Sequence, residues 1–177
     1  MSQTARLTVG DTEVELPVVQ GSEGERAVDI RHLRERTGLV TLDPGFANTG
    51  SCKSAITFVD GERGVLRYRG IPIEQFEQSP NFVEVAWLLI FGRFPKKAEL
   101  DRFSVLLTEY APLHEAMKHH FEGFPVDAPP MAILSAMINT LSCFEPQFSK
   151  FEDDEAFEHA AAKLISKVRT IAAYSYR

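Results

Sequence analysis

The sequence predicts a mainly α protein that begins with a small β-rich segment. Two observations lead to this prediction. Up to Gly70, short stretches alternate apolar and polar residues with a period of two, which is typical of half-buried strands. Beyond Gly70 the period changes to about 3.6 and continues through about five helical stretches. We therefore divide the chain into a β-rich segment with a hairpin, residues 1–75, and a helical part, residues 76–177.

The first predicted element is a small hairpin over residues 4–20. Leu7 and Val9 precede the turn residues Gly10-Asp11, and loosely alternating Val14, Leu16 and Val18 follow them. Residues 21–26 form a polar turn. The next apolar positions, in residues 28–33, fit either a short helical turn or an extended piece.

A second hairpin is predicted between residues 56 and 69. On one arm, Ile56 and Phe58 alternate with Thr57 and Val59. On the other arm, Leu66 and Tyr68 alternate with two arginines. The loop between the arms contains Asp60-Gly61 and Gly64, residue types that tolerate the positive φ of short hairpin loops.

The first helix is predicted to follow Ser79, a suitable N-cap, with Pro80 as its first residue and Gly92 as its stop. Trp87 borders its apolar face. That face consists of Phe82, Val83, Ala86, Leu89 and Ile90.

Two further helices are predicted before a stiff proline-rich connector at 125–130. One runs from about Lys96 to Tyr110, and Pro112 ends it and starts the next. The apolar stripe of the former is Leu100, Phe103, Leu106, Leu107 and Tyr110, and that of the latter is Leu113, Met117, Phe121 and Phe124.

The last two predicted helices are the most apolar. Residues 131–144 are apolar almost all round, so we expect this helix to be buried on most sides. The acids at 153–155 suit the first turn of a final helix over 155–177, because they match the helix dipole. Its predicted buried stripe is Phe157, Ala160, Ala161, Leu164, Val168, Ile171 and Ala172. No capping glycine follows, so we expect that the sequence stops inside this helix and is a piece of a longer chain.

Composition narrows the class of function. The 177 residues carry a net charge of −6, which argues against binding to a phosphate backbone. No apolar stretch is long enough to span a membrane, and the first residues lack the apolar core of a signal peptide, so we expect a cytoplasmic protein. Cys52 and Cys143 are far apart in sequence, and we expect two free thiols.

Candidate chemistry is sparse. His114-Glu115 lacks a second histidine four residues on, because position 118 is Lys118, so a zinc pair is not expected there or at His119. His32, between Arg31 and Arg34, is a weak anion candidate. Cys52 has no base near it in sequence, Gly61 and Gly64 mark a turn rather than a phosphate loop, and the acids at 153–155 lack calcium-loop spacing. We predict no metal, cofactor-binding or catalytic residue in this chain.

The region from Thr41 to Phe76 contains a dense set of residues that together form a recognisable motif. They are Asp43-Pro44-Gly45-Phe46, Thr49, Ser51-Cys52, Ser54, Ile56-Thr57-Phe58, Asp60-Gly61, Gly64, Leu66, Tyr68-Arg69-Gly70 and Ile73. With these residues the region resembles the N-terminal region of citrate synthases of the longer bacterial type. The likeness continues into residues 80–95 and is looser after Tyr110.

The resemblance implies an N-terminal portion of an enzyme that joins acetyl-CoA, oxaloacetate and water to give citrate and CoA. In the family, an Asp deprotonates acetyl-CoA, two His act on the carbonyls and Arg residues hold the carboxylates, all in the later part of the chain. This chain would therefore supply scaffold and, through helices near 131–144 and 155–177, a homo-oligomer interface, without a cofactor. Two alternatives are a fragment of a methylcitrate synthase and a free-standing helical interaction module of the same ancestry.

The resemblance also bears on regulation. Some citrate synthases of this type are inhibited by NADH and carry an Arg-His-Thr-like run where the second long helix ends. The matching run here is Glu109-Tyr110-Ala111, with a carboxylate in place of a cation. Lys163 and Lys167 could bind an anion, but we expect them to be solvated lysines and expect the full-length enzyme to be insensitive to NADH.

Overall fold

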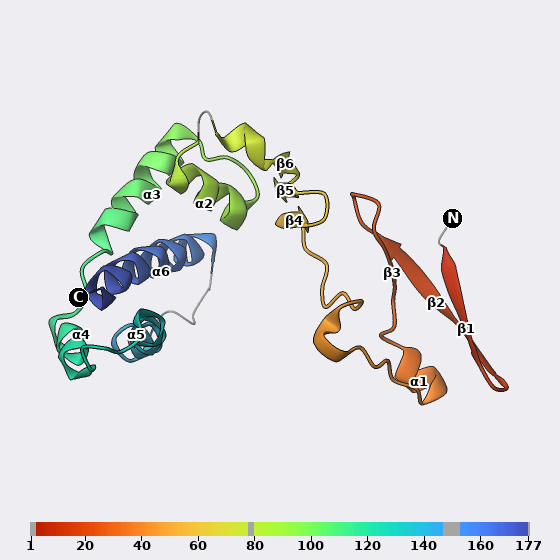
Figure 1. The fold of residues 1–177 in the computed structure, drawn as a ribbon. Coiled ribbons are helices and arrows are strands. Elements are labelled where there is room, and N and C mark those ends of the chain that lie inside the picture. Colours follow the sequence, from red (N-terminus) through yellow and green to blue (C-terminus); the bar gives the residue numbers. More distant parts are fainter. Residues whose placement is uncertain (1–2, 78–79, 147–152, 177) are drawn as a thin grey trace. The chain divides into compact units, whose positions relative to one another are not determined.

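The computed structural model describes residues 3–77, 80–146 and 153–176. The chain divides into two compact units, residues 1–54 and 55–177, and each is described by itself. Figure 1 labels the helices and strands of both units.

The first unit is a three-stranded antiparallel sheet with one short helix. Strands β1 (Thr4–Val9) and β2 (Thr12–Gln20) form the predicted hairpin, with Leu7 opposite Val14, and β3 (Arg26–Val28) pairs with the end of β2. Helix α1 (Leu33–Thr37) follows, so the stretch left open from sequence is extended first and helical afterwards. Val14, Leu16 and Leu33 form the small core, and a 3₁₀ turn, Pro44–Phe46, comes next.

The second unit begins with the second predicted hairpin. Strand β4 (Thr57–Asp60) pairs with β5 (Val65–Tyr68), which pairs with the short β6 (Ile71–Pro72). Gly64 adopts φ 65° in the loop, as the sequence predicts. Arg69 and Gly70 both have positive φ between β5 and β6, and a 3₁₀ turn (Ile73–Phe76) leads on.

Helix α2 (Phe82–Phe91) begins differently from the prediction. Its N-cap is Asn81, whose side-chain oxygen accepts hydrogen bonds from the backbone N–H groups of Val83 and Glu84. The Glu84 carboxylate in turn accepts from the Asn81 N–H, so a capping box starts the helix. The predicted cap, Ser79, lies outside the described residues. Gly92 ends the helix with φ 79°, as predicted.

The buried side of α2 also differs from the prediction. Trp87 and Leu88 are buried, whereas Phe82, the first residue of the helix, is 69% exposed. Helix α3 (Lys97–Glu109) is confirmed at its predicted place, and it buries Phe103, Leu106 and Leu107. Trp87 packs edge-on against Phe103, with ring centroids 5.4 Å apart.

The rest of the unit contains α4 (Glu115–Lys118), a 3₁₀ turn (His119–Gly123), α5 (Pro130–Phe144) and α6 (Asp154–Ser175). Asp153 caps α6 by accepting from the Ala156 N–H at 2.7 Å. One core cluster joins α5 to the residues around α4, and a second joins α2 to α3; α6 contributes Ile171 to the former and Ala162 to the latter. No described helix is long and apolar enough to cross a membrane.

Candidate functional site

Helix α6 buries the face that the sequence did not predict. The predicted stripe is largely accessible: Phe157 is 39% and Leu164 is 45% exposed, and of the predicted positions only Ile171 is buried. The buried positions are Glu158, Ala162, Ser166, Lys167, Ile171 and Ser175. The prediction failed because periodicity identifies an apolar face without identifying what covers it. Within this chain α6 packs against apolar residues at Ala162 and Ile171, and between these two positions its polar residues meet a row of backbone carbonyls.

That row consists of the Leu107 carbonyl near the C-terminal end of α3 and the Ala111 and Pro112 carbonyls just after the helix, and we call its contacts with α6 the polar seam. Ser166 Oγ donates to the Leu107 carbonyl at 2.6 Å, and Thr170 Oγ1 donates to the Ala111 carbonyl at 2.8 Å. Lys167 Nζ donates to the Pro112 carbonyl. The last carbonyls of a helix have no partner within the helix, and a cation there also suits the helix dipole. The polar residues of α6 therefore satisfy the end of α3.

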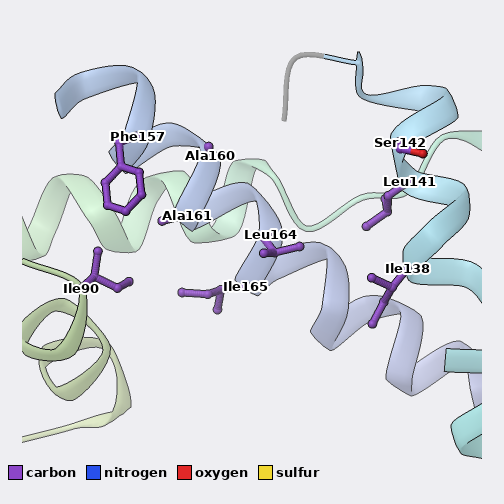
Figure 2. A pocket seen from close by; sticks show the side chains of 9 residues that line it. All are labelled: Ile90, Ile138, Leu141, Ser142, Phe157, Ala160, Ala161, Leu164 and Ile165. Atoms are coloured by element: carbon purple, nitrogen blue, oxygen red, sulfur yellow. The ribbon is translucent and has the colours of Figure 1, made fainter. Parts of the chain in front are cut away.

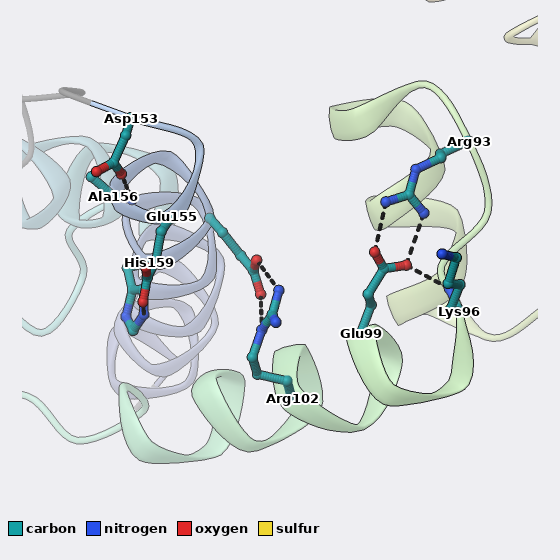
Figure 3. A network of polar contacts seen from close by, with 9 residues as sticks. Arg93, Lys96, Glu99, Arg102, Asp153, Glu155, Ala156 and His159 are labelled. Atoms are coloured by element: carbon teal, nitrogen blue, oxygen red, sulfur yellow. Dashed lines mark hydrogen bonds and ion pairs between the residues drawn. The ribbon is translucent and has the colours of Figure 1, made fainter.

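Charged and aromatic side chains extend the seam toward the start of α6. Arg102 Nε and Nη2 donate to the two carboxylate oxygens of the buried Glu158 at 3.0 and 2.6 Å. Tyr110 Oη lies 2.6 Å from His159 Nδ1. Figure 3 shows Arg102 of α3 reaching α6, and beside it Arg93 paired with Glu99. These long-range pairs fix the rotation of α6 about its own axis.

A second polar contact ties the end of α5 to α6. Glu145 Oε2 lies 2.9 Å from Lys163 Nζ, and Glu145 Oε1 lies 3.6 Å from Lys167 Nζ. The side chains of Lys163 and Lys167 are only 19% and 9% exposed. The expectation that they are solvated lysines is therefore wrong, because a carboxylate 18 residues or more away in sequence approaches them.

The outward apolar face of α6 lines a hollow of about 460 Å³. Figure 2 shows side chains of α2, α5 and α6 converging on this space. The lining residues are Ile90, Ile138, Leu141, Ser142, Phe157, Ala160, Ala161, Leu164 and Ile165. Among the described residues that line it, only Ser142 carries a hydroxyl, and none is charged or titratable. Such a surface favours burial against another apolar surface, and these residues supply no acid or base.

Helix α5 adjoins the same hollow. It buries Ile133, Met137 and Leu141 along one side, whereas Met131 is 72% exposed and Ala136 is exposed. In this chain the helix is thus covered on one side, and the prediction that it is buried on most sides is wrong for the chain by itself.

The residues singled out for chemistry do not form a site. His114 caps α4 by accepting from the Ala116 N–H at 3.1 Å, and Glu115 pairs with Lys118 at 2.6 Å. His32 lies 3.1 Å from Glu35, while Arg31 is held by Asp29. Within residues 3–77, 80–146 and 153–176, no three His, Cys, Asp or Glu side chains gather as a metal site would require.

Cys52 and Cys143 are exposed free thiols. The acids at the start of α6 lie in its cap and first turn, as predicted. The residues that sequence reasoning missed are Glu145, Ser166 and Thr170. The signal for the last two was a ridge of small or polar residues at spacing four, Glu158, Ala162, Ser166 and Thr170, which can pack closely on another helix.

The comparison with known proteins agrees with the fold. The family model described as citrate synthase, C-terminal domain, matches residues 45–177. The chain belongs to the citrate synthase family. It is 40% identical over 174 residues to citrate synthase 1 of Mycobacterium tuberculosis (strain H37Rv), covering 98% of this chain. The same match covers 40% of that relative, so the chain spans well under half of its length.

Solved citrate synthases share the fold. The enzyme of Thermotoga maritima MSB8 is 27% identical with a TM-score of 0.62 over 77% of this chain and 35% of its own. That of Pyrobaculum aerophilum, 24% identical, has a TM-score of 0.67 over 99% of this chain and 40% of its own. The Thermoplasma acidophilum enzyme, solved as a ternary complex with carboxymethyl coenzyme A and oxaloacetate, is 20% identical, with a TM-score of 0.69 over 77% of this chain and 36% of its own.

Proposed function

We propose that this chain is the N-terminal portion of a citrate synthase and supplies scaffold and a subunit interface to the whole enzyme. That enzyme would convert acetyl-CoA, oxaloacetate and water into citrate and CoA. It would be a soluble cytoplasmic enzyme that needs no cofactor. The observation that carries the interface is the orientation of α6. It turns a polar face toward its own chain and leaves an apolar one, with Phe157 and Leu164, on the surface.

The energetics favour a partner for that face. Fully burying a large apolar side chain is worth roughly 1.5–3 kcal/mol, so the exposed stripe of α6 and the adjoining wall of α5 gain several times that amount from a cover. A second copy presents the same two apolar surfaces, and a self-complementary contact of this kind is the usual arrangement in a twofold dimer. We therefore propose homo-oligomerisation through α5 and α6, the helices near 131–144 and 155–177.

The catalytic residues of the proposed enzyme lie outside this chain. Enolisation of a thioester needs a positioned base and a donor to the carbonyl oxygen, and the apolar hollow offers neither. We expect the purified chain to release no CoA from acetyl-CoA in the presence of oxaloacetate. Turnover above the uncatalysed background, from protein free of host enzyme, would contradict this assignment.

A charge placed on the exposed apolar face of α6 tests the proposed interface. Leu164→Asp should keep the helical content and lower self-association at least about tenfold, because a carboxylate would have to be desolvated on assembly. The matched control is Val105→Asp, since Val105 is a 54% exposed apolar residue on α3 that does not line the hollow. Sedimentation equilibrium of the three proteins distinguishes the cases. A parent chain that stays monomeric, or two variants that weaken association equally, would refute the interface.

A further inference from the structure

We propose that Glu145 is a positioning residue for the subunit interface. Its ion pairs with Lys163 and Lys167, which we call the clasp, hold the end of α5 against α6 and so set the shape of the apolar hollow. This inference rests on the proposed function, because it concerns the surface on which a second copy would pack. It adds a specific electrostatic contact that assembly depends on, located outside the apolar surface itself.

The clasp is built from partly buried charges. Glu145 is the residue that closes α5, and its N–H donates to the Leu141 carbonyl at 2.8 Å. Its carboxylate is 24% exposed and lies between the ammonium groups of Lys163 and Lys167, at 2.9 and 3.6 Å. Ion pairs shielded from solvent to this degree are screened less by salt than surface pairs are.

Both lysines are held in place by other groups. Lys167 Nζ also donates to the Pro112 carbonyl after α3. Lys163 Nζ lies 5.1 Å from the centroid of the Tyr110 ring, a favourable position for a cation over an aromatic face. The two cations are thus fixed relative to the polar seam, and Glu145 is the part that joins them to α5.

The clasp lies at the rim of the hollow. On α5, Leu141 and Ser142 precede Glu145 by about one turn of helix, and both line the hollow. On α6, Leu164 adjoins Lys163 and also lines it. Along α5, Ile133, Met137 and Leu141 belong to one core cluster, and Phe144 packs against it. Glu145 adds the ion pairs that join the end of this helix to α6, so its loss removes one constraint on the wall that Leu141 and Ser142 form.

A dimer interface needs close shape complementarity, comparable to the packing of a protein interior. A wall that moves by a fraction of an ångström loses dispersion contacts along its whole length. We therefore expect loss of the clasp to weaken dimer association, in addition to any change in the stability of the single chain.

The test is a double-mutant cycle on self-association of this chain. Glu145→Gln and Lys163→Gln should each raise the dimer dissociation constant about tenfold, and the double variant should raise it no more than either alone, because the two residues act through one contact. The control is Glu155→Gln, an 86% exposed carboxylate on the same helix, which should change the constant less than about twofold.

Far-UV circular dichroism and urea unfolding establish that each variant is folded, and Glu145→Asp, which keeps the charge on a shorter side chain, should recover part of the affinity. Folded Glu145→Gln protein with a dissociation constant within about twofold of the parent, or strictly additive effects in the cycle, would overturn the proposal while leaving the interface itself intact. A parent chain that never dimerises would overturn both.

Discussion

The hydroxyl of Ser166, in the middle of α6, donates a 2.6 Å hydrogen bond to the carbonyl oxygen of Leu107 near the end of α3. Ser166 is 1% exposed, so neither group can turn to water instead. A small hydroxyl residue here does two things: it lets the helices approach closely, and it satisfies a carbonyl that α3 leaves unpaired. The bond holds α6 in the rotation that turns Leu164 outward.

Ser166→Ala should therefore destabilise the chain by about 1–2 kcal/mol, because it leaves a buried carbonyl without its partner. Thr108→Ala is a suitable control, since Thr108 is exposed and its hydroxyl bonds to Ser104 within the same helix. Urea unfolding followed by circular dichroism measures both. Equal, small changes in the two variants would show that the seam bond contributes little.

A second prediction concerns Arg69, which ties the hairpin to α2. Arg69 Nη2 donates to the Leu89 carbonyl at 2.6 Å, near the end of α2, while its own backbone has φ 50°. Arg69→Lys removes the planar fork but keeps the charge, and we expect a loss of about 1–3 kcal/mol in the free energy of unfolding. Arg63→Lys, at a 77% exposed position in the hairpin loop, should change it by less than about 0.5 kcal/mol.

This contact also gives a physical reason for the Tyr68-Arg69-Gly70 match with citrate synthases. Two successive residues with positive φ make the tight connection from β5 to β6, and glycine is favoured at the second. The arginine at the first sends its side chain to the end of α2, beside Gly92. Packing and backbone geometry are thus sufficient to explain the motif.

The third prediction is a pH dependence centred on Glu99. The Arg93 guanidinium, together with the Lys96 N–H, lowers the pKa of the Glu99 carboxyl from 4.5 to about 2. A carboxyl with a depressed native pKa stabilises the fold above its ordinary pKa, and the contribution is lost as the pH falls from 4.5 toward 2. Glu99→Gln should therefore be less stable than the parent at neutral pH, and the difference should shrink across that window.

Urea unfolding of both proteins at neutral pH and at two acidic values checks the sign. Asp101→Asn serves as the control, because Asp101 is 60% exposed and its pair with Lys97 is a surface contact of little energetic value. A parent–variant difference for Glu99 that stays constant down to the lowest pH would show that the carboxylate charge is not the source of the effect.

Local sequence patterns predicted the positions of helices and strands better than they predicted which faces of those elements pack against each other. Helix α3 and both hairpins follow from periodicity and turn residues, because these depend on neighbours within a few positions. The cap of α2 was misplaced since Ser79 and Asn81 are both good N-caps, and only the capping box with Glu84 distinguishes them. The buried face of α6 could not be predicted, because its apolar stripe is stronger than the polar ridge that the chain itself covers.

The polar contacts of the candidate site were also beyond sequence reasoning. Glu145 and Lys163 are far apart along the chain, and no periodic signal links two charged residues on different helices. The same holds for Arg102 with Glu158. Such pairs follow from the packing of α3, α5 and α6, so they can be identified only from the three-dimensional arrangement of those helices.

Inhibition by NADH is the subject of the last prediction. The resemblance predicts an enzyme that is insensitive to NADH, because Glu109 stands where a cation would meet a phosphate. The structure adds a second reason. Glu145 lies between Lys163 and Lys167, so an incoming phosphate would have to displace a carboxylate that both ammonium groups contact. Like charges at about 4 Å repel by roughly 4 kcal/mol at an effective dielectric of 20.

We therefore expect the full-length enzyme to keep its rate in millimolar NADH, and the chain itself to show no change in NADH fluorescence on titration. Glu145→Gln removes the competing carboxylate and leaves both lysines, so it tests whether Glu145 alone excludes the anion. If it does, this variant should gain weak binding that Lys163→Gln then abolishes. Strong inhibition of the unaltered enzyme, relieved by changing Lys163 or Lys167, would show instead that a phosphate competes successfully with Glu145.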